Sequence, residues 1–181
     1  MELRELEAMS EGLRIALKYS KDKYRFIALE GMYAESLVAM KLLENEYNVD
    51  FHGPQFDLLV DGKKQIEVKC GVLKTWGAGA SFGMGKQITE DKFDYCVFVV
   101  LDRDKDYEPI KFFVFSREEL KECGKHRPDL TEPNTPSILF YYKNAKDLEE
   151  SEKKGELVFT IERELVYYPE KFEDKWDKIS P

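Results

Sequence analysis

The chain of 181 residues has few of the side chains that build disulfide frameworks or zinc–thiolate sites. Its three cysteines, Cys70, Cys96 and Cys123, are odd in number, and no two of them have CxxC spacing. The sequence therefore argues against a cysteine scaffold of either kind.

Only two histidines are present, His52 and His126, and neither stands in a recognisable setting with a nucleophile. A histidine-based catalytic triad is disfavoured for that reason.

Long apolar runs are also missing. No stretch approaches the ~20 apolar residues that a membrane-spanning helix needs. The N-terminal residues are charged and lack the apolar centre of a secretory signal. We expect a cytoplasmic protein with no membrane partner.

An excess of basic residues is lacking as well, since the net charge is −8 and the pI is about 5.0. This balance argues against a protein that coats nucleic acid non-specifically. The charge is unevenly distributed, however. Five lysines and one glutamate lie between Gly62 and Ile88, whereas residues 145–181 hold eleven acidic and seven basic residues. A nucleic acid could therefore approach the lysine-rich segment.

The apolar periodicity predicts two helices followed by strands. The helices are expected at about 4–19 and 26–44, and a further helix should begin near Ser116, a favoured N-cap residue. Strands are expected at 56–60, 65–69, 94–101, 110–115 and 157–161, the first two joined by a tight turn at Asp61–Gly62. This order predicts a single α/β domain over 1–181 with a central mixed β-sheet flanked by helices. Its core would span about 26–115, and residues 116–181 would form an extension of uncertain role.

Glycine is concentrated in one segment. Residues 71–85 contain five glycines, which predicts a mobile loop, and Lys86–Lys92 is a candidate short helix. Trp76 and Phe82 within the loop could touch bases, or they could anchor the loop on the core, which is slightly favoured. Lys74 adds positive charge, so Lys74 and Trp76 are candidate DNA contacts.

Two acids and a lysine are expected to meet on the hairpin. Side chains alternate along a strand, so Glu67 and Lys69 share one face, and Asp57 begins the partner strand. Neighbouring carboxylates repel each other, and a divalent cation relieves that repulsion. Such an ion could activate water and stabilise charge on a phosphate, with Lys69 assisting.

The run Phe56–Asp57, nine residues, then Glu67–Val68–Lys69 resembles the PD-(D/E)xK nuclease superfamily. Upstream, Gly31–Met32–Tyr33–Ala34–Glu35 resembles the G-x-x-A-E stretch of its archaeal Holliday junction resolvase branch. The resemblance implies a restriction-endonuclease-like core. It also implies a Mg²⁺-dependent (or Mn²⁺-dependent) DNA endonuclease with Asp57, Glu67 and Lys69 as catalytic residues.

Further roles follow from the same resemblance. Asp57, Glu67 and Glu35 would bind the metal, and Lys86 and Gln87 match a position where some members carry an auxiliary lysine or glutamine.

Several alternatives remain open from the sequence. The three hairpin residues could be a solvated face with a surface ion pair. Glu30 competes with Glu35, although the two lie about 140° apart round a helix and would not face one metal. Cleavage could serve restriction or junction resolution and repair, and both predict a homodimer. The domain could also be an inactive DNA-binding or scaffolding module, and RNA is a possible substrate.

Overall fold

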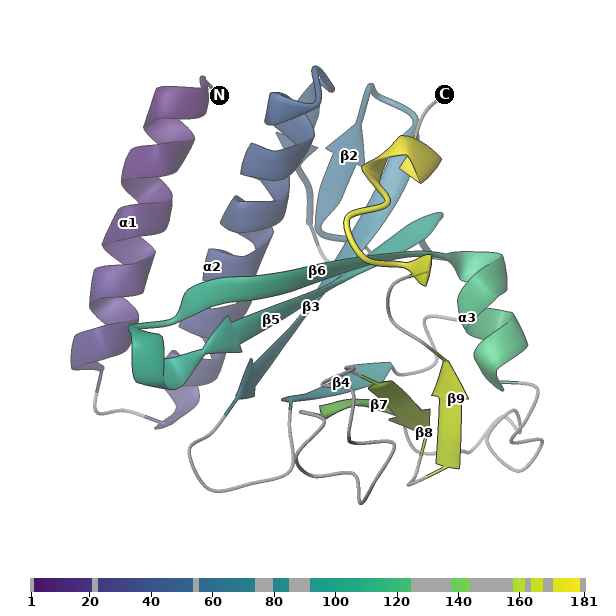
Figure 1. Ribbon diagram of the computed structural model, residues 1–181. Coiled ribbons are helices and arrows are strands. Elements are labelled where there is room, and N and C mark those ends of the chain that lie inside the picture. The colour runs from purple at the N-terminus through teal and green to yellow at the C-terminus, as the bar shows by residue number, and fades with distance from the viewer. Residues whose placement is uncertain are drawn as a thin grey trace.

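The computed structural model describes residues 2–20, 23–53, 56–73, 80–84, 92–124, 138–143, 158–161, 164–167 and 171–179. Its helices are α1 (Leu3–Tyr19), α2 (Lys23–Glu44) and α3 (Arg117–Gly124), with short 3₁₀ turns at η2 (Arg103–Lys105) and η7 (Trp176–Ile179). The strands are β1 (Val49–Phe51), β2 (Leu58–Val60), β3 (Lys64–Leu73), β4 (Ala80–Met84), β5 (Tyr95–Asp102), β6 (Glu108–Ser116), β7 (Ile138–Lys143), β8 (Val158–Ile161) and β9 (Glu164–Tyr167). Figure 1 shows their arrangement.

A five-stranded mixed sheet organises the described part of the chain. Its order is β1-β2-β3-β5-β6, and β3 and β5 run parallel while the other neighbours are antiparallel. The parallel pair aligns Glu67 with Cys96 and Lys69 with Phe98. Helices α1 and α2 lie side by side on one face of this sheet (Figure 1). The prediction of an α/β fold with a helix-flanked mixed sheet is confirmed.

The residue alternation of the strands supplies a separate core on each face of the sheet. On the helical face, Ile66, Val68, Val97 and Val99 pack in one cluster with residues of α1 and α2 such as Leu42. On the opposite face, buried phenylalanines pack in a row: Phe82 on Phe98, Phe98 on Phe115, and Phe115 on Phe172. Every one of these four residues is less than 2% exposed. A polar site on this face must therefore lie beside the aromatic row.

The described ends of the glycine-rich segment form strands. The prediction of one mobile loop over 71–85 is wrong for its described ends, because β3 continues to Leu73 and β4 occupies Ala80–Met84. Strand β4 opens a second, antiparallel sheet of order β4-β7-β8-β9. Phe82 is 1% exposed and stacks on Phe98 at 4.6 Å, so its expected anchoring role is confirmed. The glycine content alone does not reveal strand β4, which the buried ring of Phe82 holds against the core.

The C-terminal segment 171–179 returns to the five-stranded sheet and lies along β6. Val114 donates a backbone hydrogen bond to Phe172 (2.8 Å), and Asp174 donates one to Phe112 (3.1 Å), so residues 171–179 cover the β6 edge. The sequence predicted only an extension of uncertain role over residues 116–181, because charged and aromatic residues without a period do not reveal a segment held by β6.

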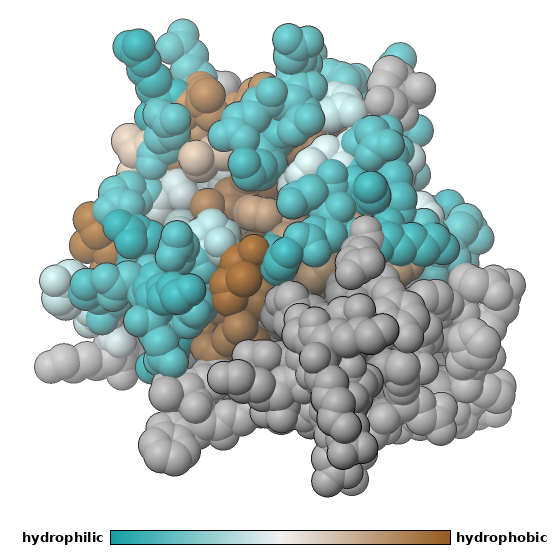
Figure 2. Space-filling model, viewed as in Figure 1, coloured by the Kyte–Doolittle hydropathy of each residue, from teal (hydrophilic) through white to brown (hydrophobic). Residues whose placement is uncertain are grey.

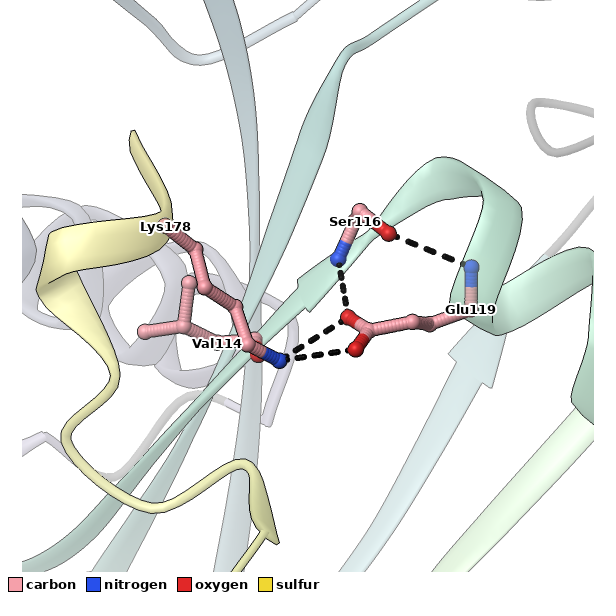
Figure 3. A network of polar contacts seen from close by, with 4 residues as sticks. All are labelled: Val114, Ser116, Glu119 and Lys178. Atoms are coloured by element: carbon pink, nitrogen blue, oxygen red, sulfur yellow. Dashed lines mark hydrogen bonds and ion pairs between the residues drawn. The ribbon is translucent and has the colours of Figure 1, made fainter. Parts of the chain in front are cut away.

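Figure 3 shows the hydrogen bonds and ion pair that hold residues 171–179 against α3. The Glu119 carboxylate accepts from Lys178 Nζ at 2.8 and 3.0 Å and from the Ser116 N–H at 2.9 Å. Ser116 Oγ in turn accepts from the Glu119 N–H at 3.2 Å. Ser116 and Glu119 thus form a capping box, which confirms the predicted helix start. The same glutamate ties the last helical turn of the chain to β6.

Among the described residues in view, hydrophilic ones predominate, and apolar residues show as smaller patches between them (Figure 2). Within the described ranges no helix is long and apolar enough to cross a membrane.

Candidate active site

The hairpin register brings the first two predicted acids together. Leu58 pairs with Ile66, so Asp57 stands opposite Glu67 where the two strands begin to separate. The Asp57 N–H donates to the Ile66 carbonyl at 3.0 Å, and Asp57 Oδ2 accepts from the Val68 N–H at 2.7 Å. These two bonds hold the Asp57 carboxylate against β3. The turn at Asp61–Gly62, both in the left-handed region at φ 50° and 65°, sets that register.

Glu67 and Lys69 form an ion pair on one face of β3, as their alternate positions predicted. The Glu67 side chain is only 4% exposed, and that of Lys69 is 24% exposed. A buried carboxylate requires such a partner, because an unpaired charge in the interior is strongly disfavoured. The interpretation of these residues as a solvated surface pair is therefore wrong: Glu67 lies in the interior and Lys69 reaches from it toward solvent.

Glu35 joins the hairpin acids from α2. Burial, followed by the charges of Asp57 and Glu67, raises the pKa of Glu35 to about 7, while Lys69 acts in the opposite direction. Electrostatic influence from both acids requires all three carboxyl groups to occupy one region. Of the two helix glutamates, Glu35 is the one on which the charges of Asp57 and Glu67 act. The charge of Glu30 acts instead on Cys70, whose side chain alternates away from Glu67 and Lys69 on β3.

The remaining ionisable groups respond to the same environment. Burial raises the pKa of Asp57, although the hydrogen bond from the Val68 N–H and the charge of Lys69 oppose this. Burial tends to lower the pKa of Lys69, but its bond to Glu67 and the nearby carboxylates outweigh burial and raise it. Three acids and one firmly protonated lysine leave the region short of positive charge.

The donor set fits a hard divalent cation in chemistry and charge. Carboxylate oxygens are the ligands that Mg²⁺ prefers, usually with waters and phosphate oxygens completing its shell. Asp57, Glu67 and Glu35 supply those oxygens. Across the described ranges, no three Asp, Glu, His or Cys side chains are assembled as a ready-made metal-binding group. The oxygens are instead engaged within the protein, Glu67 by Lys69 and Asp57 by the Val68 N–H.

Four auxiliary candidates lie outside the described residues: Lys74, Trp76, Lys86 and Gln87. Sequence reasoning also gave little weight to His52, which the structure places beside Asp57. The His52 N–H donates to the Asp57 carbonyl at 2.9 Å, and its ring stacks on that of Phe56 at 4.1 Å. Its position five residues before the first acid was the only signal in the sequence. The stacked ring and β1 together brace the strand end that carries Asp57.

Comparisons with known proteins give a likeness in structure but none in sequence. No family model matches the chain, and no curated protein matches its sequence. Among solved structures, the chain is similar to a bacterial homing endonuclease with a TM-score of 0.47 and 15% sequence identity, covering 84% of this chain and 89% of that one.

Proposed function

We propose that this protein is a metal-dependent DNA endonuclease that hydrolyses phosphodiester bonds. One observation carries the proposal: three carboxyl groups from α2, β3 and the start of β2 share one region around Lys69, where burial and the charges of the other two acids raise the pKa of Glu35 to about 7. A fold has no structural need for such a cluster, because burying like charges together is destabilising. Clusters of this kind are typical of functional sites.

Each of the four residues would have its own role in the hydrolysis. Asp57 and Glu67 would hold a Mg²⁺ or Mn²⁺ ion, and Glu35 would support it. The bound ion would supply charge neutralisation and an acidified water. Lys69 would orient the attacking water or neutralise the negative charge that grows on the phosphate. Water adds to phosphorus, one bridging P–O bond breaks, and the departing oxygen takes up a proton.

DNA as the substrate rests on the resemblance of the hairpin to the PD-(D/E)xK pattern and on the lysines around it. The strand arrangement supports this reading, since the first acid leads into β2 and the acid-x-lysine set lies on β3. Cutting both strands of a DNA duplex requires two active sites, so a homodimer remains a prediction.

The decisive experiment is a cleavage panel of duplex, flap, single-strand and four-way-junction DNA, with Mg²⁺, Mn²⁺ or EDTA, and with RNA as a further arm. Metal-dependent cleavage that Asp57→Asn abolishes is expected. Asn keeps a carbonyl oxygen to accept the Val68 N–H, so the hairpin should survive the change. Asp61→Asn, in the same hairpin but at the exposed turn, is the matched control and should cleave normally.

The alternative is an inactive DNA-binding or scaffolding module, in which the Lys69–Glu67 pair is structural. It predicts DNA binding without cleavage and no stabilisation by Mg²⁺. Absence of cleavage from every arm, together with a metal titration that shows no binding, would favour this alternative and refute the endonuclease.

A further inference from the structure

On the side of helix α2 that carries Glu35, residues are buried after Glu35 and exposed or partly exposed before it. One and two turns after this residue, on the same side of the helix, Val38, Ala39 and Leu42 are fully buried. One and two turns before it, Ala28 and Met32 are exposed and Gly31 is partly exposed. Glu35 therefore stands at the rim where the packed half of α2 gives way to an open half.

The open half is apolar. Ile27 is 61% exposed and Met32 is 50% exposed, and both belong to the small set of large apolar residues that the described surface leaves uncovered. Ala28 and Gly31 lie between them, so Glu35 is the only charged residue on this side of α2 from Ile27 onward. Among the side chains that the structure describes, a methyl group at Gly31 would meet only Glu35 Oε1, at 3.9 Å. We call Ile27, Ala28, Gly31 and Met32 the open face.

We propose that the open face is a second substrate-contacting surface, against which the sugars and base faces of the DNA strand pack while its phosphate reaches the metal ion that Glu35, Asp57 and Glu67 would hold. This inference rests on the proposed function. The reason is continuity: packed residues cover α2 beyond Glu35, so a polymer that approaches the carboxylates along α2 must lie over Gly31 and Met32. Side chains without charge cannot hold phosphates, but they suit the apolar faces of deoxyribose and bases.

The chemistry predicts a specific binding signature. Removing apolar contacts weakens binding without changing the number of phosphates neutralised, so the slope of log K against log salt stays constant. Loss of two large apolar side chains from such a contact should weaken binding by about tenfold or more. A variant that removed a phosphate contact would lower the slope as well.

The test measures binding of a noncleavable DNA in Ca²⁺ at several salt concentrations. Ile27→Ala/Met32→Ala should lose about tenfold in affinity with an unchanged salt slope. Ile15→Ala/Tyr19→Ala is the matched control, because these side chains are also exposed, at 48% and 72%, but lie on α1. The control should bind as the wild type does.

A second pair separates binding from folding. Gly31→Leu and Gly12→Leu each replace a helical glycine: among the described residues, a Cβ at Gly12 meets nothing within 4 Å and one at Gly31 makes only an ordinary contact at 3.9 Å, so both should raise helix stability. Only Gly31→Leu should weaken DNA binding, because it fills the path to Glu35. A stabilised protein that binds DNA less well cannot be explained by misfolding.

Three results would overturn the inference, and they are distinguishable. If the wild type binds DNA but both open-face variants bind it equally well, the inference fails and the proposed function stands. If those variants keep DNA affinity but change the sedimentation coefficient, the open face is instead an interface between copies of the chain. If the wild type neither binds nor cleaves DNA, the proposed function fails and the inference fails with it.

Discussion

Replacing Glu35 with Gln should stabilise this protein at alkaline pH and leave its stability unchanged at mildly acidic pH. The folded state holds the Glu35 proton up to about pH 7, whereas the unfolded chain releases it near 4.5. The folded state therefore binds more protons between these values, and its stability falls as pH rises through that window. Glutamine stays neutral at every pH and avoids this loss.

The size of the effect follows from the same pKa. A rise from 4.5 to about 7 corresponds to roughly 3 kcal/mol when fully expressed. Because the Glu35 side chain is partly exposed, screening by solvent reduces the expected gain to about 1–2 kcal/mol at pH 8. At pH 5 the wild-type carboxyl is protonated in the folded state, so the two proteins should differ little.

Urea denaturation at pH 5, 6, 7 and 8, in EDTA, measures the difference directly. Glu11→Gln is the control, since that exposed carboxyl has a lowered pKa through its hydrogen bond to Arg14 and should show no alkaline gain. Mg²⁺ should then stabilise the wild type at pH 8 more than it stabilises Glu35→Gln. A pH-independent effect of Glu35→Gln, or none at pH 8, would refute the convergence of the three carboxylates.

Three further predictions concern packing and pairing. Lys69→Ala should abolish cleavage and also destabilise the fold by about 1–3 kcal/mol, because the buried Glu67 carboxylate loses its ion pair with Lys69. Adding Glu67→Gln should restore stability but not activity, as chemical denaturation would show. An unchanged stability of Lys69→Ala would contradict the buried pair. Phe172→Ala should cost roughly 3–5 kcal/mol in the same assay, since its ring is 1% exposed and stacks on Phe115 at 4.2 Å; a cost below about 1 kcal/mol would mean that the C-terminal return is loosely held. Burial raises the pKa of Cys96 far above its usual range, so peptide mapping after alkylation should find Cys96 unlabelled in the native state, and rapid labelling would contradict its place in the core.

The sequence by itself determined the elements with strong periodicity. Both N-terminal helices were predictable, because apolar residues recur at helical spacing, and the hairpin was predictable from Asp61–Gly62 and the alternation up to Lys69. Strict alternation also places Glu67 and Lys69 on one face of their strand. These features depend on neighbours in the chain, which the sequence displays directly.

Contacts between distant segments were decided only by the tertiary structure. Phe82 turns part of a glycine-rich segment into a strand by stacking on Phe98, and Phe172 holds the C-terminal return against Phe115. Burial likewise converted the Lys69–Glu67 pair from a candidate surface contact into an interior one. The neighbouring residues in the sequence do not indicate these contacts or this burial, because a residue's solvent exposure depends on the distant segments that pack over it.

The candidate site combines both kinds of information. Local alternation fixed Glu67 and Lys69, and the turn fixed Asp57 opposite them, so the hairpin part of the site could be predicted from sequence. Glu35 could be proposed from resemblance, but Glu30 competed with it until packing of α2 against β3 decided which side of the helix faces the acids. The rotation of a helix about its axis is set by the surface that it buries, and that surface exists only once the sheet has formed.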